Sequence, residues 1–391
     1  MKIPLKYSFR NLQTRRLTTA LTMLGVALVV FVFAAVLMMA YGIEKTLVST
    51  GSTDNVLVAR KASNGEISSI LDGETANIIL AMDQVARTSD GSPLATKDVA
   101  TVINLPKKGN ESALTNVTVR GVSPPAFTLR PMVKIVEGRM FQWGSREVIV
   151  GSGIARRIVG SNVGGTIKFG GDTWTVVGRF DANGCAFDSE IWGDVLQVTE
   201  ALARSNYFST MTFRLKSPQE FESFKAAFAR DPRLQQFEPK TERKFFEEQS
   251  ETMALFIRVL GIFITIIFSL GSAIGAMITM YGAVANRTVE IGTLRALGFR
   301  RRSILSAYLM ESLMLALIAG VVGIIFASFL QFFRISTINF DSFAEIEFSF
   351  ALSPWIIGGS ITFALFMGFI GGFLPAVRAA RLSILNALRA S

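Results

Sequence analysis

Four long runs of apolar residues divide the chain, namely Thr18–Tyr41, Val259–Ala285, Ile304–Phe333 and Trp355–Val377, and only one charged residue, Glu311, lies inside them. A helix needs about 20 apolar residues to cross the hydrocarbon core of a bilayer, which is about 30 Å thick. A signal peptide has an apolar core of only about 7–15 residues, so we expect the first run to be a retained helix. The pattern predicts transmembrane helices over 18–42, 253–285, 304–333 and 355–377.

Between the first two runs lie about 200 residues with a different pattern, in which apolar and polar residues alternate. Alternation over four to eight residues is typical of half-buried strands. We expect strands over 55–60, 98–105 and 116–122, and we expect helices over about 74–86 and after Ser217-Pro218. The pattern predicts an α+β domain over 43–250, inserted between the first and second transmembrane helices.

The stretch that enters the second membrane run contains no proline after Pro239. A single helix over about 241–285 would be on the order of 65 Å long, longer than a bilayer is thick. Its charged first third would then stand above the membrane as a stalk, which is the interpretation we favour. The alternative is two helices with a break near Ser250.

Charge decides which side of the membrane each segment faces. The formal net charge is +10, but residues 43–250 hold 25 Lys and Arg against 24 Asp and Glu, so the excess lies near the helix ends. This placement predicts no nucleic-acid partner. Basic residues favour the cytoplasmic side, which places both termini (1–17 and 378–391) and the 286–303 segment in the cytoplasm. The 43–250 domain and the 334–354 loop then lie outside. The arginines expected at the membrane interface are Arg15, Arg16, Arg300, Arg301, Arg302, Arg378 and Arg381.

Few residues here could carry out chemistry. The chain has no histidine, which excludes a Ser-His-Asp triad and the common zinc sites, and its one cysteine, Cys185, cannot form an internal disulfide. No G-x-x-x-x-G-K-[ST] phosphate loop occurs in the 391 residues. We therefore expect no catalytic residue, metal or cofactor on this chain. Four glycines suit close packing of transmembrane helices, namely Gly271, Gly275, Gly371 and Gly372. Glu311 is expected near a membrane interface, paired with one of the arginines at 300–302.

The 286–303 segment lies between two membrane runs. Its pattern predicts a short helix from about Arg287 that stops at Gly298, a residue typical of helix ends. The segment could be a charged loop that only fixes topology, or a docking helix for a cytoplasmic subunit.

Motifs in four places resemble one family. The first is R-x-x-E-I-G-x-x-R-A-x-G over 287–298, which continues into I-x-x-x-x-L-x-E-S over 304–312. The others are the arm SFRNLQTRRLTT at 8–19, the ending GGFLPAVRAARLSILNALRA at 371–390, and the domain text around 119–180. Together they resemble the MacB/FtsX-type (type VII) permeases of ABC transporters. The family often has two basic residues where this chain has Leu294-Arg295.

The resemblance implies a permease subunit of the bacterial cytoplasmic (inner) membrane that works by mechanotransmission. ATP and magnesium would bind a separate ABC ATPase subunit, whose action would move the outer domains for export or for lipid or lipoprotein movement. It also implies a second permease copy, contacts with membrane lipids, and room for an extracytoplasmic adaptor. The alternative is a membrane-anchored regulator or scaffold of an extracytoplasmic partner, such as a cell-wall hydrolase. The residues implied in ATPase coupling are Arg287, Glu290, Ile291, Leu294, Arg295, Ala296, Leu297 and Gly298.

Overall fold

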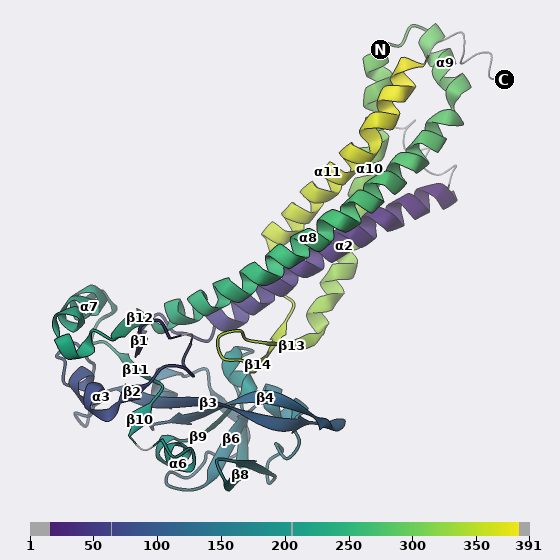
Figure 1. Ribbon diagram of the computed structural model, residues 1–391. Coiled ribbons are helices and arrows are strands. Elements are labelled where there is room, and N and C mark those ends of the chain that lie inside the picture. Colours follow the sequence, from purple (N-terminus) through teal and green to yellow (C-terminus); the bar gives the residue numbers. More distant parts are fainter. Residues whose placement is uncertain (1–15, 64, 205, 383–391) are drawn as a thin grey trace. The chain divides into compact units, whose positions relative to one another are not determined.

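The computed structural model describes residues 16–63, 65–204 and 206–382, and it divides into two compact units (Figure 1). The helical unit consists of residues 16–41, 255–333 and 350–382. The domain consists of Gly42–Ala254 together with Arg334–Ser349. The predicted N-terminal arm up to Arg15, the side chain of Arg16 and the final motif from 383 onward lie outside the described residues.

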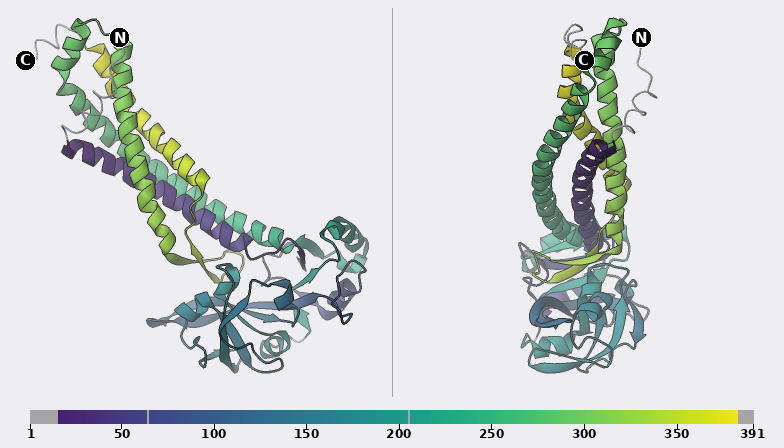
Figure 2. Two further views of the ribbon diagram at one scale, coloured as in Figure 1. Left: turned by 180° about the vertical axis from the view of Figure 1, so that it is seen from behind. Right: turned by 90° about the vertical axis from the view of Figure 1, so that its right-hand side faces the viewer.

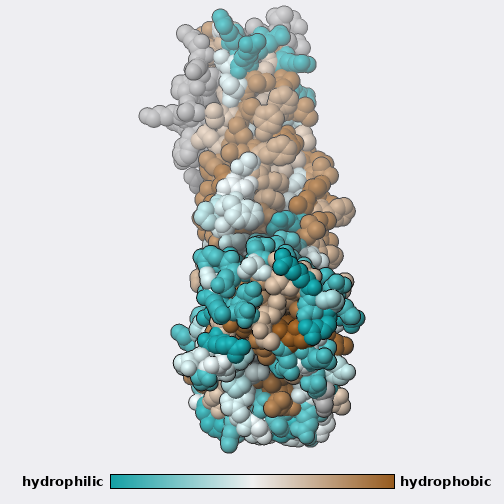
Figure 3. Space-filling model, turned by 90° about the vertical axis from the view of Figure 1, so that its left-hand side faces the viewer, coloured by the Kyte–Doolittle hydropathy of each residue, from teal (hydrophilic) through white to brown (hydrophobic). Residues whose placement is uncertain are grey.

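Four helices among the described residues are long and apolar enough to cross a membrane, which confirms the predicted number. They are α2 (Arg16–Val48), α8 (Glu242–Ala285), α10 (Arg301–Ser328, extended by the 3-10 turn η4, Phe329–Phe332) and α11 (Pro354–Arg381). In both views α10 and α11 run side by side (Figure 2). On the face shown in Figure 3 the helical unit is mostly hydrophobic, whereas the domain surface is largely polar.

Glycines set how closely α10 and α11 approach each other and their neighbours. A Cβ atom added at Gly371 would lie 2.9 Å from the Ala276 side chain, and one at Gly372 would overlap Ser312. Gly271 and Gly275 make no close approach within this single chain, because a Cβ at either would have open space around it. Both lie on the exposed side of α8. An all-apolar helix does not reveal in its sequence which side will be buried.

Helix α8 is one uninterrupted helix of 44 residues, as predicted. Its first residue, Glu242, is fully buried in the domain. No break occurs at Ser250, which is itself buried and whose hydroxyl donates to the Glu247 carbonyl one turn earlier. The same helix therefore supplies residues to both units.

The domain is built on a ten-stranded mixed sheet in the order β12-β1-β11-β3-β4-β9-β6-β8-β5, with β7 also paired to β8. Two short antiparallel pairs, β2–β10 and β13–β14, lie outside it. The strands are β1 (Asn55–Arg60), β2 (Leu71–Asp72), β3 (Ala95–Lys107), β4 (Asn110–Val122), β5 (Lys134–Gly138), β6 (Glu147–Gly151), β7 (Thr166–Phe169), β8 (Asp172–Asp181), β9 (Glu190–Asp194), β10 (Tyr207–Phe208), β11 (Thr210–Arg214), β12 (Phe237–Thr241), β13 (Arg334–Ile338) and β14 (Glu345–Ser349).

Strand β3 joins the two halves of the sheet. Its first residues, from Ala95 to Asp98, pair with β11, and from Val99 onward it pairs with β4. Short helices cover the sheet and bury a large apolar cluster that includes Trp174 and Phe213. These helices are α3 (Gly73–Leu80), α4 (Ala126–Leu129), α5 (Ser152–Arg157), α6 (Val195–Ala201) and α7 (Phe221–Arg230), with 3-10 turns η1 (Ala186–Ser189), η2 (Pro218–Glu220) and η3 (Pro232–Leu234).

Two elements differ from the sequence-based expectation. The helix predicted over 74–86 is α3, which ends at Leu80 because the following chain pairs with β11: the Ala86 N–H donates to the Arg214 carbonyl over 2.8 Å. The predicted 334–354 loop contains the hairpin β13–β14, which belongs to the domain. Its residues alternate as in strands, but each strand has only five residues, so the pattern between two membrane runs did not by itself predict a hairpin.

Candidate functional site

The 286–303 segment contains the short helix α9 (Thr288–Ala296), which connects α8 to α10. Glu290 lies in its first turn and Arg295 in its last, as the helix dipole favours. Gly298 has φ +92°, the left-handed conformation that ends the helix. The Phe299 N–H donates to the Leu294 carbonyl, and the Gly298 N–H donates to the Arg295 carbonyl, both over 3.1 Å. This pattern is a Schellman cap, so the segment has a defined end.

One side of α9 faces the helical unit. Ile291 is only 1% exposed and packs in an apolar cluster with Ile304, Tyr308 and Ala376 of α10 and α11. The Arg295 guanidinium donates to the Ala380 carbonyl over 3.1 Å. A cation at this position satisfies a carbonyl in the last turn of α11 and suits its dipole.

The third inward residue, Arg287, pairs with Glu311 of α10. Its Nη1 lies 3.4 Å from a Glu311 carboxylate oxygen, and both side chains are about nine-tenths buried. A carboxylate within a membrane-length helix needs such a partner. The structure therefore revises the expectation that Glu311 pairs with Arg300, Arg301 or Arg302, which are all exposed. The segment 300–302 lies close to Glu311 in sequence, but Arg287 reaches it across the fold.

The opposite side of α9 is exposed and partly apolar. Val289 is 42% exposed and Leu297 is 67% exposed, with Thr293 and Ala296 exposed between them. Residues two apart on a helix point about 200° apart. The inward stripe 287/291/295 and the outward stripe 289/293/296/297 therefore lie on opposite sides of the same short helix.

The eight residues predicted for ATPase coupling are consequently divided. Arg287, Ile291 and Arg295 hold α9 to the helical unit, and Leu294 is half-buried. Glu290, Ala296, Leu297 and Gly298 are exposed. The predicted coupling residues did not include Val289 and Thr293 of the outward stripe. The inward residues Arg287, Ile291 and Arg295 are spaced four apart, and this spacing in the sequence could have distinguished the buried side of α9 from its exposed side.

The arginines predicted at the membrane interface lie, where the structure describes them, at the start of α10 and at the end of α11. Arg378 and Arg381 are exposed in the last turns of α11. The Arg378 guanidinium lies over the Tyr281 ring at 5.5 Å from its centroid, which fixes it against α8.

Inside the domain, two arginines and four carboxylates form a buried charge network. Arg120 makes paired contacts with Glu66 and with Glu190, at distances of 2.5–2.9 Å. Burial alone would lower the pKa of Arg120, but the two carboxylates outweigh it and raise that pKa well above its ordinary value. Burial would likewise raise the pKa of Glu66, but Arg120 lowers it. Arg120 and Glu66 therefore stabilise each other in their charged forms.

The second arginine of the network, Arg130, connects the sheet to α8. Its Nη2 lies 2.7 Å from an Asp98 carboxylate oxygen, and its Nε donates to Glu242 over 2.9 Å. Glu242 also accepts from the Asn55 side chain over 2.9 Å and from the Ser52 backbone N–H over 3.1 Å. The first residue of α8 is thereby held by three partners, namely Arg130, Asn55 and Ser52, and we call this set of contacts the Glu242 anchor.

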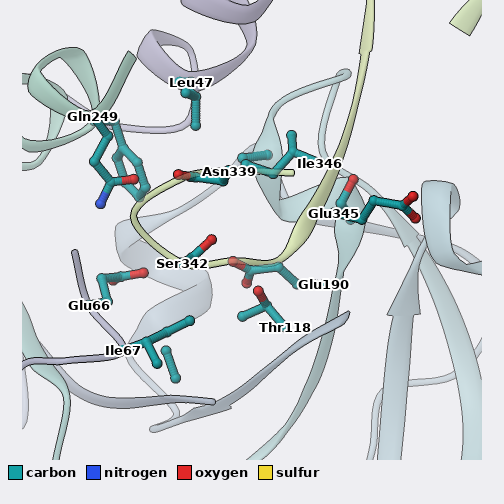
Figure 4. Close-up of a pocket in the computed structure, with 14 residues that line it drawn as sticks. Leu47, Glu66, Ile67, Thr118, Glu190, Gln249, Asn339, Ser342, Glu345 and Ile346 are labelled. Carbon is teal, nitrogen blue, oxygen red and sulfur yellow. The ribbon is translucent and has the colours of Figure 1, made fainter. Parts of the chain in front are cut away.

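A small cavity lined by both polar and apolar side chains lies next to this network (Figure 4). Its volume is about 30 Å³, enough for one water molecule. In Figure 4 the hairpin residues Asn339 and Ser342 cross above Glu66 and Thr118. Among the described residues, no group of three or more His, Cys, Asp or Glu side chains could hold a metal ion. The Cys185 thiol is buried, which raises its pKa to about 12 and suppresses its reactivity.

Comparison with known proteins identifies both parts of the chain. Residues 19–231 match the family model of the MacB-like periplasmic core domain, and residues 262–384 match the FtsX-like permease C-terminal model. The chain is 25% identical to the macrolide export ATP-binding/permease protein MacB of Bdellovibrio bacteriovorus, over 98% of this chain and 61% of that protein. It is 27% identical to the pyoverdine export ATP-binding/permease protein PvdT of Pseudomonas entomophila, over 98% and 59%.

The chain therefore spans about three-fifths of the length of these curated relatives. Among solved structures, it is similar to the periplasmic region of MacB from Actinobacillus actinomycetemcomitans. That match has 14% identity and a TM-score of 0.37, and it covers 53% of this chain and 94% of that one.

Proposed function

Because this chain belongs to the family of MacB- and FtsX-type ABC transporter permeases, we propose that it works by mechanotransmission. An ABC ATPase on a separate subunit, which binds ATP and magnesium, pushes on α9 from the cytoplasm. The helices pass that movement to the domain on the other side of the membrane. Both termini lie in the cytoplasm, and the domain lies outside the bacterial inner membrane.

The observation that carries this proposal is the two-sided character of α9. Its inward stripe fixes it to α10 and α11, so that a push on α9 moves those helices as well. Its outward stripe presents Val289 and Leu297 on an exposed surface, which suits docking of a protein partner. A loop that only fixed topology would need neither a buried ion pair nor an exposed apolar stripe.

Two further features support mechanical transmission by the helices rather than passage of cargo between them. The four apolar runs hold a single charged residue, Glu311, which is paired with Arg287, and Arg258 lies just before the second run. Ionisable residues that line a hydrophilic path are the usual mark of a conducting route. The uninterrupted α8, anchored in the domain by Glu242, provides a stiff element for transmission.

We also propose a second copy of the permease beside this one, with lipids around the pair. Gly271 and Gly275 are four residues apart on an exposed side of α8, where small residues let two helices approach closely. An extracytoplasmic adaptor is a further candidate partner. Relatives named for macrolide and pyoverdine export favour an export role, with lipid or lipoprotein movement as the other output. A regulator of an extracytoplasmic enzyme is the second candidate function.

Co-purification with substitution of the outward stripe tests the proposal. The chain is isolated from its native membrane in mild detergent, and an ATPase subunit with a phosphate loop is expected with it. Leu297→Asp removes an exposed apolar anchor, and loss of an anchor worth about 2 kcal/mol weakens binding roughly thirtyfold. Arg301→Gln changes charge by the same amount just outside α9 and should leave recovery unchanged.

Two further variants separate docking from coupling. Glu290→Ala alters the exposed side of α9, and Arg295→Ala releases it from α11, so both should lower transport more than they lower ATP hydrolysis. If the ATPase is absent from the native complex, or if Leu297→Asp recovers it as fully as Arg301→Gln does, the docking role of α9 is wrong.

A further inference from the structure

The hairpin β13–β14 is the part of the chain that enters the domain from α10 and leaves it toward α11. Its strands pair from Arg334 opposite Ser349 to Ile338 opposite Glu345. The chain reaches β13 directly from η4, and α11 begins five residues after β14 ends. Any movement of the outer ends of α10 and α11 therefore acts on this hairpin.

Two carboxylates of β14 fit against three basic residues of the domain. Glu345 lies 2.7 Å from the Lys107 amino group and 2.8 Å from Arg157 Nη1. Glu347 lies 2.7 Å from Arg156 Nη2 and 3.4 Å from Arg157 Nε. We call Lys107, Arg156 and Arg157 the basic socket. Residues two apart on a strand face the same side, so both carboxylates enter the socket together.

The elements that carry the socket explain its position. Arg156 and Arg157 form the last turn of α5, and Lys107 ends β3. The Glu345 and Glu347 side chains are 13% and 8% exposed, whereas the Arg156 side chain remains 44% exposed. The carboxylates are thus largely removed from water while the socket keeps partial access to it, which makes the contact sensitive to charge.

Further polar contacts hold the hairpin, alongside the buried apolar side chains of Ala344 and Phe348. Thr115 donates its hydroxyl to Glu345 over 2.6 Å, and the Asn116 side chain donates to the Phe343 carbonyl over 2.7 Å. The Glu347 N–H donates to the Ser189 hydroxyl over 2.9 Å. The cavity of Figure 4 is lined in part by the hairpin residues Asn339, Ser342, Glu345 and Ile346. Polar contacts of this kind are common at interfaces between parts of one chain that move relative to each other.

The charge of Glu345 is held by the same partners. Burial would raise its pKa, but Lys107, Thr115 and Arg157 together lower that pKa below its ordinary value. The carboxylate therefore stays ionised in the socket at neutral pH.

We infer that Glu345 and Glu347 in the basic socket form a second joint, through which α10 and α11 act on the domain. This inference rests on the proposed function. The Glu242 anchor is the first joint, and it attaches the domain to α8. A domain attached at one joint only follows that helix. A domain attached at two joints turns when the helices shift relative to one another, so the second joint converts a push on α9 into rotation.

Charge reversal and charge exchange test the second joint in the assembled complex with its ATPase. Glu345→Lys with Glu347→Lys should release the hairpin. Adding Arg156→Glu with Arg157→Glu should restore opposite charges and recover the joint. Glu137→Lys with Glu200→Lys is the matched control, because it changes net charge equally and disrupts exposed ion pairs of the same domain.

Two measurements are made on each variant. Hydrogen exchange of residues 334–349 without nucleotide should be about tenfold faster after reversal, because attractive pairs become repulsive. Spin labels at Leu196→Cys in the domain and Ile357→Cys on α11 report whether ATP changes their distance. The buried Cys185 does not compete for the label. After reversal, the ATP-dependent change should be lost and transport should fall about tenfold, the size of ordinary coupling free energies, while ATP hydrolysis continues.

The outcomes separate this inference from the proposed function. Rescue by charge exchange, with the matched control behaving as the native chain, supports the joint. An ATP-dependent distance change that persists after reversal overturns the joint and leaves the proposed function standing. The absence of any ATP-dependent change in the native complex overturns both. Faster hydrogen exchange without rescue in the charge-exchange variant would show that the pairing is not what holds the hairpin, and would also overturn the inference.

Discussion

Removing the Glu242 carboxylate should destabilise the domain strongly. Glu242 is the first residue of α8, is fully buried, and accepts from Arg130, Asn55 and the Ser52 backbone N–H. Glu242→Ala leaves these three donors without their acceptor in a dry site. Arg130 keeps its ion pair with Asp98, so its charge is only partly uncompensated.

The expected size follows from the number of groups left behind. Removing one partner of a buried ion pair costs about 3–5 kcal/mol. That is a large share of the roughly 5–15 kcal/mol by which a domain is stable. For a domain of about 200 residues, each kcal/mol lowers the melting temperature by about 2–4 °C. Glu242→Ala should therefore lower the melting temperature of the domain by roughly 6–20 °C.

The assay is thermal unfolding of the full chain in detergent, combined with hydrogen exchange to locate the change. The matched control is Glu248→Ala, in the same helix, where the carboxylate pairs with Lys240 and both side chains are partly exposed. Such pairs contribute about 0–1 kcal/mol, so the control should melt close to the native temperature. Faster exchange in Glu242→Ala should appear first in β1, which borders β12 and carries Asn55.

Equal melting temperatures for Glu242→Ala and Glu248→Ala would refute this reasoning. They would mean that the domain holds α8 by its apolar contacts alone. The Glu242 anchor could then not serve as a fixed joint.

Three further changes follow from individual contacts. Gly323→Ala places a Cβ 2.6 Å from the Ala27 carbonyl oxygen and should cost about 1–3 kcal/mol, whereas Gly358→Ala has open space and should be neutral or slightly stabilising, as thermal unfolding would show. Because burial raises its pKa to about 12, Cys185 should resist maleimide at pH 8 in the folded chain and react in denaturant, as mass spectrometry would show. The pKa of Glu345 is lowered in the fold, so its contribution is complete above its ordinary value of 4.5 and is lost as pH falls through the lower folded-state value. Hydrogen exchange of 334–349, corrected for intrinsic rate, should then accelerate only in acid.

The sequence was informative where one local pattern decides a structure. Uncharged runs of membrane length predicted the four helices, and alternation predicted strands such as β1, with the same bounds as observed. The absence of proline after Pro239 predicted the unbroken α8. Gly298 marked the end of α9 because few other residues adopt its backbone conformation.

The sequence was not informative where partners are distant along the chain. Nothing in the pattern pairs Arg130 with Glu242, which is 112 residues away, or Arg157 with Glu345, which is 188 residues away. The same limit explains why Glu311 was assigned the nearer arginines of 300–302. The sides of α8 and α9 that are buried also depend on tertiary packing, which the apolar character of the helices conceals.

The unbroken backbone of α8 also constrains how this chain can change in length. Each residue inserted into an α-helix turns everything beyond it by about 100° and advances it by about 1.5 Å. One extra residue in the middle of α8 would therefore rotate the whole domain about the helix axis by about 100°. Seven extra residues complete nearly two turns and almost restore the original orientation of the domain. Lengths of this helix among related chains should accordingly cluster in steps of three, four or seven residues, while surface loops of the domain vary freely.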